Sequence, residues 1–150
     1  MTELKPILLA EDNPNDAELT VEALTDKNLA NQVTLVKDGV EAMEYLRCEG
    51  QYQTRRSGNP AVVILDIKMP RMDGIEVLRA IRSDAALARI PVVMLTSSRE
   101  EHDLLRSYEL GVNAYVVKPV KFTDFIIAVK QVGNFWAVVN EIPSEWREQA

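Results

Sequence analysis

Short apolar runs alternate with segments whose apolar residues recur at helical spacing along most of this 150-residue chain. The clearest run, at residues 62–65, reads Val-Val-Ile-Leu without a polar interruption, which is typical of a strand buried on both faces. Four further runs have the length and composition of strands. The predicted strands cover residues 7–10, 32–36, 62–65, 90–96 and 113–117.

A predicted helix follows each of these strands. The pairs Asp38-Gly39 and Asp73-Gly74 precede two of the helices, Gly111 ends a third, and the last helix is predicted over residues 122–136. Strand–helix alternation repeated five times predicts a parallel sheet with helices on both faces and right-handed connections. The expected fold class is therefore α/β, a doubly wound parallel sheet. We expect a single domain over residues 1–150, with a C-terminal tail from about residue 137.

Polar side chains stand where the predicted strands end. Glu11 and Asp12 follow the first strand, Asp66 the third, Thr96 ends the fourth and Lys118 follows the fifth. The carboxyl ends of parallel strands meet at one edge of the sheet, where open α/β sheets bind their ligands. Three carboxylates at close range repel one another unless a cation lies among them, and an oxygen-only site with open positions suits Mg²⁺. Thr96 and Lys118 would surround a phosphoryl group, and Asp66 could attack its phosphorus atom.

These residues resemble the receiver domain of two-component response regulators. The motifs are Glu-Asp at 11–12, Asp-x-x-Met-Pro-x-Met-Asp-Gly at 66–74, Thr-Ser-Ser at 96–98 and Lys-Pro at 118–119. They occur in the order found in the family, and the pattern covers residues 5 to about 135. The resemblance implies a flavodoxin-like (β/α)5 fold with strand order 2-1-3-4-5. It also implies a single-domain response regulator that takes a phosphoryl group from a sensor histidine kinase and signals to a downstream protein target.

The resemblance implies a metal site. Asp66 would be the phosphoacceptor, and Asp12 and Asp66 would bind Mg²⁺ directly. Glu11 would assist through a water molecule, and the backbone carbonyl of Lys68 would complete the shell.

A second set of roles concerns switching, again as the resemblance implies. Thr96 would donate a hydrogen bond to a phosphoryl oxygen, Lys118 would pair with the phosphoryl group, and Tyr115 would be the aromatic switch residue. A core aromatic is the alternative interpretation of Tyr115. The Lys118–Pro119 peptide bond would be cis, a form that proline makes accessible.

The chain also resembles a narrower group, the single-domain regulators that partner phytochrome-type sensor kinases. That likeness rests on the long polar loop at 49–59 and on the C-terminal sequence Phe135-Trp136 with Ile-Pro-Ser at 142–144. It implies a light signal as the input.

The same residues argue against three other functions. A Mg²⁺-dependent phosphatase with an aspartate nucleophile would need a general acid two residues after Asp66, where this chain has Lys68. A flavin-binding module would need a Ser/Thr/Gly-rich loop where Glu11 and Asp12 stand. A degenerate receiver acting only as an interaction module would be expected to have lost some of the chemical positions, and here all are present.

The composition limits the kinds of binding partner and the cellular compartment that we expect. Charged residues make up 27% of the chain, and the formal net charge of −6 argues against a nucleic-acid partner. No apolar run approaches the length that spans a bilayer, and the N-terminus lacks a signal-peptide pattern. Cys48 is the only cysteine, so no internal disulfide can form. These features predict a cytoplasmic protein without a membrane partner.

The last predicted helix is apolar on two sides. Phe122, Ile126, Val129 and Gly133 have the spacing expected of a face packed on the sheet, and a second set lies beside them: Phe125, Ala128, Val132, Phe135 and Val139. We expect the second set to form a homodimer interface with the fourth helix and fifth strand, in which Phe125, Val132 and Phe135 take part. The alternative is that the tail, with Ile142 and Trp146, folds back over it.

Overall fold

Five parallel strands form the sheet at the centre of the molecule. The computed structural model describes residues 6–25, 33–55, 58–141 and 143. The strands are β1 (Ile7–Ala10), β2 (Val33–Val36), β3 (Val62–Leu65), β4 (Val92–Thr96) and β5 (Ala114–Val117). Their order is β2-β1-β3-β4-β5, and every neighbouring pair is parallel. The predicted fold class and strand order are therefore confirmed; β4 starts two residues later than predicted, and Gln32 of the predicted second strand lies outside the described residues.

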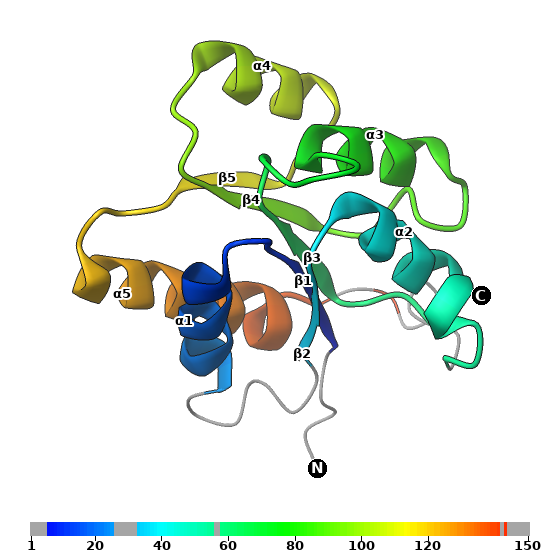
Figure 1. The fold of residues 1–150 in the computed structure, drawn as a ribbon, viewed down its shortest axis with the longest axis horizontal. Coiled ribbons are helices and arrows are strands. Elements are labelled where there is room, and N and C mark those ends of the chain that lie inside the picture. Colours follow the sequence, from blue (N-terminus) through cyan, green and yellow to red (C-terminus); the bar gives the residue numbers. More distant parts are fainter. Residues whose placement is uncertain (1–5, 26–32, 56–57, 142, 144–150) are drawn as a thin grey trace.

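Helices cover both faces of this sheet (Figure 1). The α-helices are α1 (Pro14–Thr25), α2 (Gly39–Arg47), α3 (Gly74–Ser83), α4 (Glu101–Glu109) and α5 (Phe122–Gly133). A short 3-10 helix, η2 (Gly50–Tyr52), follows α2, and a π-helical turn, η3 (Asn134–Val139), continues α5. α1 and α5 lie on one face, and α2, α3 and α4 lie on the other. In the part of the chain that the structure describes, none of these helices combines the length and the apolar character that crossing a membrane requires.

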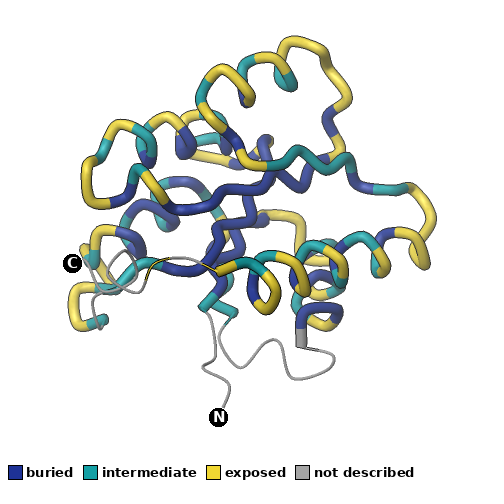
Figure 2. Tube along the Cα trace, turned by 180° about the vertical axis from the view of Figure 1, so that it is seen from behind, coloured by how far each residue is buried: buried dark blue, intermediate teal, exposed yellow. Residues whose placement is uncertain are grey.

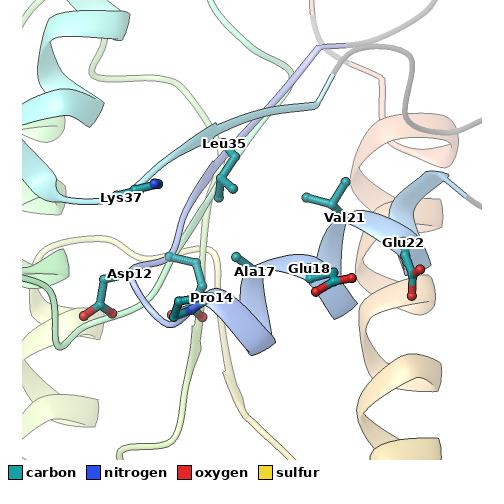
Figure 3. Close-up of a pocket in the computed structure, with 9 residues that line it drawn as sticks. Asp12, Pro14, Ala17, Glu18, Val21, Glu22, Leu35 and Lys37 are labelled. Carbon is teal, nitrogen blue, oxygen red and sulfur yellow. The ribbon is translucent and has the colours of Figure 1, made fainter.

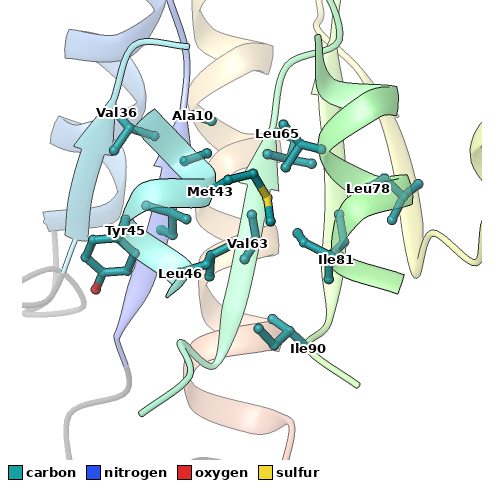
Figure 4. Close-up of a cluster of buried hydrophobic side chains, with 14 of the residues drawn as sticks. Ala10, Val36, Met43, Tyr45, Leu46, Val63, Leu65, Leu78, Ile81 and Ile90 are labelled. Carbon is teal, nitrogen blue, oxygen red and sulfur yellow. The ribbon is translucent and has the colours of Figure 1, made fainter. Parts of the chain in front are cut away.

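Alternation along the strands divides the apolar core into two layers. Leu8 and Val63 point to the face covered by α2 and α3, where they meet Met43, Leu78 and other apolar side chains (Figure 4). The intervening strand residues point to the opposite face and meet α1 and α5. Successive side chains of a strand point to opposite faces, so an unbroken apolar run fills both layers. Figure 2 shows β1, β3 and β4 as the buried centre, β5 at intermediate exposure, and many exposed residues on the outer turns of the helices.

The face that α5 turns to the sheet agrees with the predicted one at Val129 and Gly133 and differs from it at Phe122 and Phe125. Phe125 and Val129 are buried in the core with Ala137, whereas Phe122, predicted to face the sheet, is 60% exposed. The assignment of Phe125 to the outer, interface-forming face was therefore wrong. A helix that is apolar on two sides offers two faces with the same spacing, and the packing of α5 against α1 and the sheet selects between them. Helical backbone continues through η3 to Val139, past the predicted end at residue 136.

Helix α4 makes few buried contacts. Ser107 is the only residue of this helix that is buried, and the apolar side chains of Leu105 and Tyr108 are more than half exposed. The Ser107 hydroxyl donates to the carbonyl of Asp103 at 2.8 Å. α4 thus lies on the sheet as a lightly packed element, with large apolar side chains directed to its outer side.

Candidate functional site

Asp66 stands at the middle of the carboxyl edge of the sheet. It directly follows β3, the strand between β1 and β4, and its amide donates to the Ala10 carbonyl at 3.0 Å. Its side chain is 9% exposed. Gly74 packs so closely against the backbone of Asp66 that an added Cβ would overlap the Asp66 carbonyl oxygen. The Asp-Gly pair at the start of α3 is thereby explained, because Asp73 caps the helix by accepting from the Glu76 amide at 2.8 Å while Gly74 leaves room for Asp66.

Two further carboxylates approach Asp66 from the end of β1. The Glu11 amide donates to the Val36 carbonyl at 3.0 Å, which extends the β1–β2 pairing by one residue. Glu11 is buried and Asp12 is exposed. Carboxylate oxygens of Glu11, Asp12 and Asp66, one from each, all lie within 4.8 Å of one another. The structure thus brings together the three acidic residues that the sequence analysis placed in one site.

Lys118 reaches into this acidic group from the end of β5. Its amide donates to the Thr96 carbonyl at 2.7 Å, which holds the residue beside β4. Its ammonium donates to Glu11 at 2.6 Å, Asp16 at 2.8 Å and Asp66 at 3.0 Å. All three N–H bonds of the ammonium therefore have carboxylate acceptors.

Asp16 is the residue that sequence reasoning missed. It lies in the first turn of α1, where its amide donates to the Asn13 side chain at 3.0 Å. The sequence analysis considered only residues that follow the predicted strands. An acidic residue in the first turn of a helix stabilises that helix by itself, so Asp16 did not indicate a role in the site. The only available signal was its position, four residues after Asp12.

Burial and crowding set the charge states of the site. Burial, with the proximity of Asp66, raises the pKa of Glu11 to about 7, although the hydrogen bond from Lys118 partly opposes the shift. Burial lowers the pKa of Lys118, but its hydrogen bonds to Asp16 and Glu11 outweigh that effect, so its pKa lies above the ordinary value. Lys118 is therefore a permanent cation, and burial destabilises the negative charge of Glu11.

Hydroxyl groups border the site on the side of β4. Thr96 is fully buried, and its hydroxyl oxygen accepts from the Ser98 amide at 3.2 Å. The Ser98 hydroxyl donates to Asp103 at 2.6 Å. The Tyr115 hydroxyl donates to the Ser98 carbonyl at 3.1 Å, and the ring is partly buried. In the sequence, Ser98 stood out only as part of the Thr-Ser-Ser motif. The structure shows that its hydrogen bonds link Thr96, Tyr115 and the first turn of α4.

The remaining predicted site residues are Lys68, in the loop that Asp66 begins, and Val132 and Phe135, in α5 and η3. Lys68 is exposed in the loop between β3 and α3, two residues after Asp66. Val132 is partly buried against the core, and Phe135 is 48% exposed with its ring edge-to-face on Trp136, the centroids 5.0 Å apart. No peptide bond among the described residues is cis, so the expected cis Lys118–Pro119 bond is not found; the trans form is the lower in energy even before proline.

The donor set of the site fits a hard divalent cation. Glu11, Asp12 and Asp66 supply oxygen ligands, and Asp12 keeps its side chain toward solvent. With Asp16 included, four carboxylates face the single ammonium of Lys118. Oxygen ligands with an open, water-accessible side are the environment that Mg²⁺ and similar ions prefer. A bound cation would also relieve the repulsion among the carboxylates.

An open groove adjoins the acidic group (Figure 3). It runs between α1 and β2, and Glu11 and Asp12 lie at one end of it. Ala17, Val21 and Leu35 form its apolar floor.

The family model of the response regulator receiver domain matches residues 7–130. The chain belongs to this family. The predicted resemblance is thus confirmed: the fold, strand order and acidic group are those of a receiver domain. Receiver domains are signalling proteins rather than conventional enzymes, and histidine kinases phosphorylate them.

Full-length relatives carry the same domain. Response regulator Rcp1 of Synechocystis sp. is 37% identical over 140 residues, which are 93% of this chain and 94% of that protein. The crystal structure of the phosphorylated cyanobacterial phytochrome response regulator RcpA is 41% identical with a TM-score of 0.88, covering 94% of this chain and 99% of that one. The bacteriophytochrome response regulator AtBRR is 58% identical with a TM-score of 0.73, covering 93% and 100%. A Mn²⁺-bound form of Rcp1 superposes with a TM-score of 0.85 at 37% identity, covering 93% and 99%.

Proposed function

We propose that this receiver domain is a response regulator that accepts a phosphoryl group from a sensor histidine kinase on Asp66, in a Mg²⁺-dependent reaction. In this proposal, residues 1–150 form one receiver domain. The observation that carries the proposal is the placement of Asp66: a buried carboxylate within reach of two further acidic side chains and hydrogen-bonded to the Lys118 ammonium.

The chemistry assigned to Asp66 is nucleophilic. A carboxylate oxygen attacks the phosphorus of a phosphohistidine, the P–N bond breaks, and the imidazole nitrogen leaves with the bonding electron pair. Charge on the transferring group is spread over its outer oxygens, so positioning and electrostatic stabilisation supply most of the catalysis. Mg²⁺, bound by Asp12 and Asp66 with Glu11 and the Lys68 carbonyl completing the shell, would neutralise that charge. Lys118 would contribute a second positive charge on the side of β5.

Phosphorylation of Asp66 would act on the residues that border the site. The new group adds about two negative charges and strong acceptor oxygens. Thr96 would donate its hydroxyl to a phosphoryl oxygen, and Lys118 would turn from Glu11 and Asp16 toward the phosphoryl group. The Thr96 hydroxyl now accepts from Ser98, and Tyr115 donates to the Ser98 carbonyl, so a movement of Thr96 would reach Tyr115 through Ser98. This pathway couples the site to α4, whose packing is light.

A phytochrome-type kinase is the proposed input. The support comes from relatives: the phosphorylated regulator RcpA is described as a cyanobacterial phytochrome response regulator, and AtBRR as a bacteriophytochrome response regulator. By the same likeness we assign the protein to the cytoplasm, where the kinase domain of such a sensor would meet it.

Self-association is part of the proposal. Large apolar side chains remain exposed on α4, α5 and η3 among the described residues: Leu105, Tyr108, Phe122, Ile127, Phe135, Val138 and Val139. A twofold contact through α4, β5 and α5 would bury the same patch on both partners. Because Phe125 belongs to the core, the interface would use Phe135 and the exposed residues of α4 in its place, with Val132 at the margin.

Mass spectrometry of the intact protein tests the phosphoacceptor. Treatment with acetyl phosphate and Mg²⁺ should add one phosphoryl group to the wild-type protein and none to Asp66→Asn. Asp124→Asn, an exposed aspartate in the first turn of α5, serves as the matched control and should be labelled like the wild type. A phosphoryl group retained by Asp66→Asn, or a wild type that is never labelled, would refute the proposal.

A further inference from the structure

An ion pair ties the loop after Asp66 to a second loop on the same side of the sheet. Arg71, in the β3–α3 loop, donates from Nε to Asp38 Oδ2 at 2.9 Å and from a terminal nitrogen to Asp38 Oδ1 at 3.0 Å. Asp38 lies between β2 and α2. Two parallel N–H···O bonds from one guanidinium fix both distance and orientation, which a single contact does not.

Asp38 is held firmly on its own side. Its side chain is 14% exposed, and its Oδ1 also accepts from the Glu41 amide at 2.8 Å, so it caps α2. Burial acts to raise the pKa of Asp38, but the hydrogen bonds from Glu41 and Arg71 outweigh it and lower the pKa. The carboxylate is therefore an anchored, ionised partner for Arg71.

The backbone at Arg71 is in a conformation that the side chain does not favour. Its φ is +64°, in the left-handed region that glycine adopts without steric penalty. The neighbouring Met72 amide donates to the Pro70 carbonyl at 2.7 Å, so the chain turns tightly here. An arginine retained in this conformation directs its guanidinium to Asp38, and that contact offsets the backbone cost.

Backbone packing reinforces the link between the two loops. A Cβ added to Gly39 would overlap the carbonyl oxygen of Met72. The residue after Asp38 therefore lies against the residue after Arg71. Two contacts therefore join the loops. One is the ion pair between Asp38 and Arg71, and the other is the close backbone contact between the residues that follow them, Gly39 and Met72.

The β3–α3 loop, which Arg71 links to Asp38, also contains the backbone carbonyl that is proposed as a metal ligand. It starts at Asp66 and passes Lys68, whose carbonyl is the proposed ligand, before Arg71. Ile67 and Met69 are buried in the core and anchor the start of this loop, whereas Lys68, Pro70 and Arg71 are exposed and are not held by burial. We propose that the Asp38–Arg71 pair is a positioning device that holds the β3–α3 loop in its metal-binding conformation and thereby sets the affinity of the site for Mg²⁺. The inference rests on the proposed function, because it concerns the same metal site.

Calorimetric titration of the metal-free protein with Mg²⁺ tests the inference without any need for activity. Arg71→Gly removes the guanidinium and accepts the positive φ without strain, and Asp38→Asn keeps an oxygen that can cap α2 while removing the charge. Each variant should bind Mg²⁺ about three- to tenfold more weakly than the wild type, as expected for the loss of one well-oriented ion pair. The double variant should bind as weakly as either single variant, because both changes break the same contact.

Arg47→Ala is the matched control, since it removes another partly exposed ion pair, Arg47 with Asp84 at 3.4 Å, at the far end of α2. It should leave Mg²⁺ affinity unchanged. If Arg71→Gly and Asp38→Asn bind Mg²⁺ with wild-type affinity, the inference is overturned, even if their melting temperatures are lower. The ion pair would then be a structural contact only, and the proposed function would be unaffected. A wild-type protein that does not bind Mg²⁺ would overturn the proposed metal site as well.

Discussion

The charge state of Glu11 makes the stability of the metal-free protein depend on pH. Burial raises the pKa of this carboxyl from 4.5 to about 7, so between these values the native state binds a proton that the unfolded state has released. Stability must then fall as pH rises through this window. For one carboxyl with these two pKa values, the loss between pH 5 and pH 8 is about 2–3 kcal/mol. Lys118, whose pKa is raised, stays charged throughout the window and adds no slope.

Glu11→Gln removes the titrating group and keeps the shape of the side chain. Urea denaturation followed by circular dichroism, with a chelator present, should be compared for the wild type and the variant from pH 5 to pH 8. The variant should gain about 2–3 kcal/mol relative to the wild type over this range. Glu18→Gln, an exposed glutamate of α1, should keep the wild-type slope. Equal slopes for the wild type and Glu11→Gln, or a wild type that gains stability relative to the variant toward pH 8, would refute the reasoning.

Three further predictions concern the site and the core. Saturating Mg²⁺ at about 100 times its Kd should stabilise the wild type by about 2.7 kcal/mol, a rise in melting temperature of roughly 5–11 °C, and Asp12→Ala should abolish the rise; an equal rise in the variant would count against the metal site. Gly74→Ala should cost about 1–3 kcal/mol in urea denaturation and slow labelling by acetyl phosphate, because the new methyl group meets the Asp66 carbonyl; wild-type behaviour would show that the backbone can yield there. Phe125→Ala should cost about 3–5 kcal/mol and Phe135→Ala less than about 1 kcal/mol, and the reverse order would restore the predicted face of α5.

The residues at the carboxyl edge of the sheet could be predicted because an apolar strand is followed directly by a polar residue. Asp66 follows four apolar residues, and Lys118 follows the apolar end of β5, so parallel pairing alone brings them to one edge. Asp16 approaches the same ammonium from the first turn of α1. Its contact depends on how α1 crosses the sheet, and the spacing of apolar residues in one helix carries no information about that crossing.

The orientation of the helices was harder to predict than their existence. α5 carries apolar residues around more than half of its circumference, so Phe122 looked as suitable as Phe125 to share a buried face with Val129 and Gly133. The two faces differ by about one residue of rotation, and contacts with α1 decide between them. In α4, Leu105 and Tyr108 have helical spacing but point outward. Amphipathic spacing indicates that a helix has an apolar face, and it does not say whether that face is buried within one chain.

The hydrogen bond between the Lys118 amide and the Thr96 carbonyl has a consequence for how the site can move. The two residues leave neighbouring, paired strands, whose separation of about 4.8 Å is a constant of β-structure. Any change in the distance between the Thr96 hydroxyl and the Lys118 ammonium must therefore come from side-chain torsions, and the backbone of β4 and β5 stays in place. In an amide spectrum recorded before and after phosphorylation, the shifts would concentrate at the carboxyl ends of these strands and in the loops that begin there.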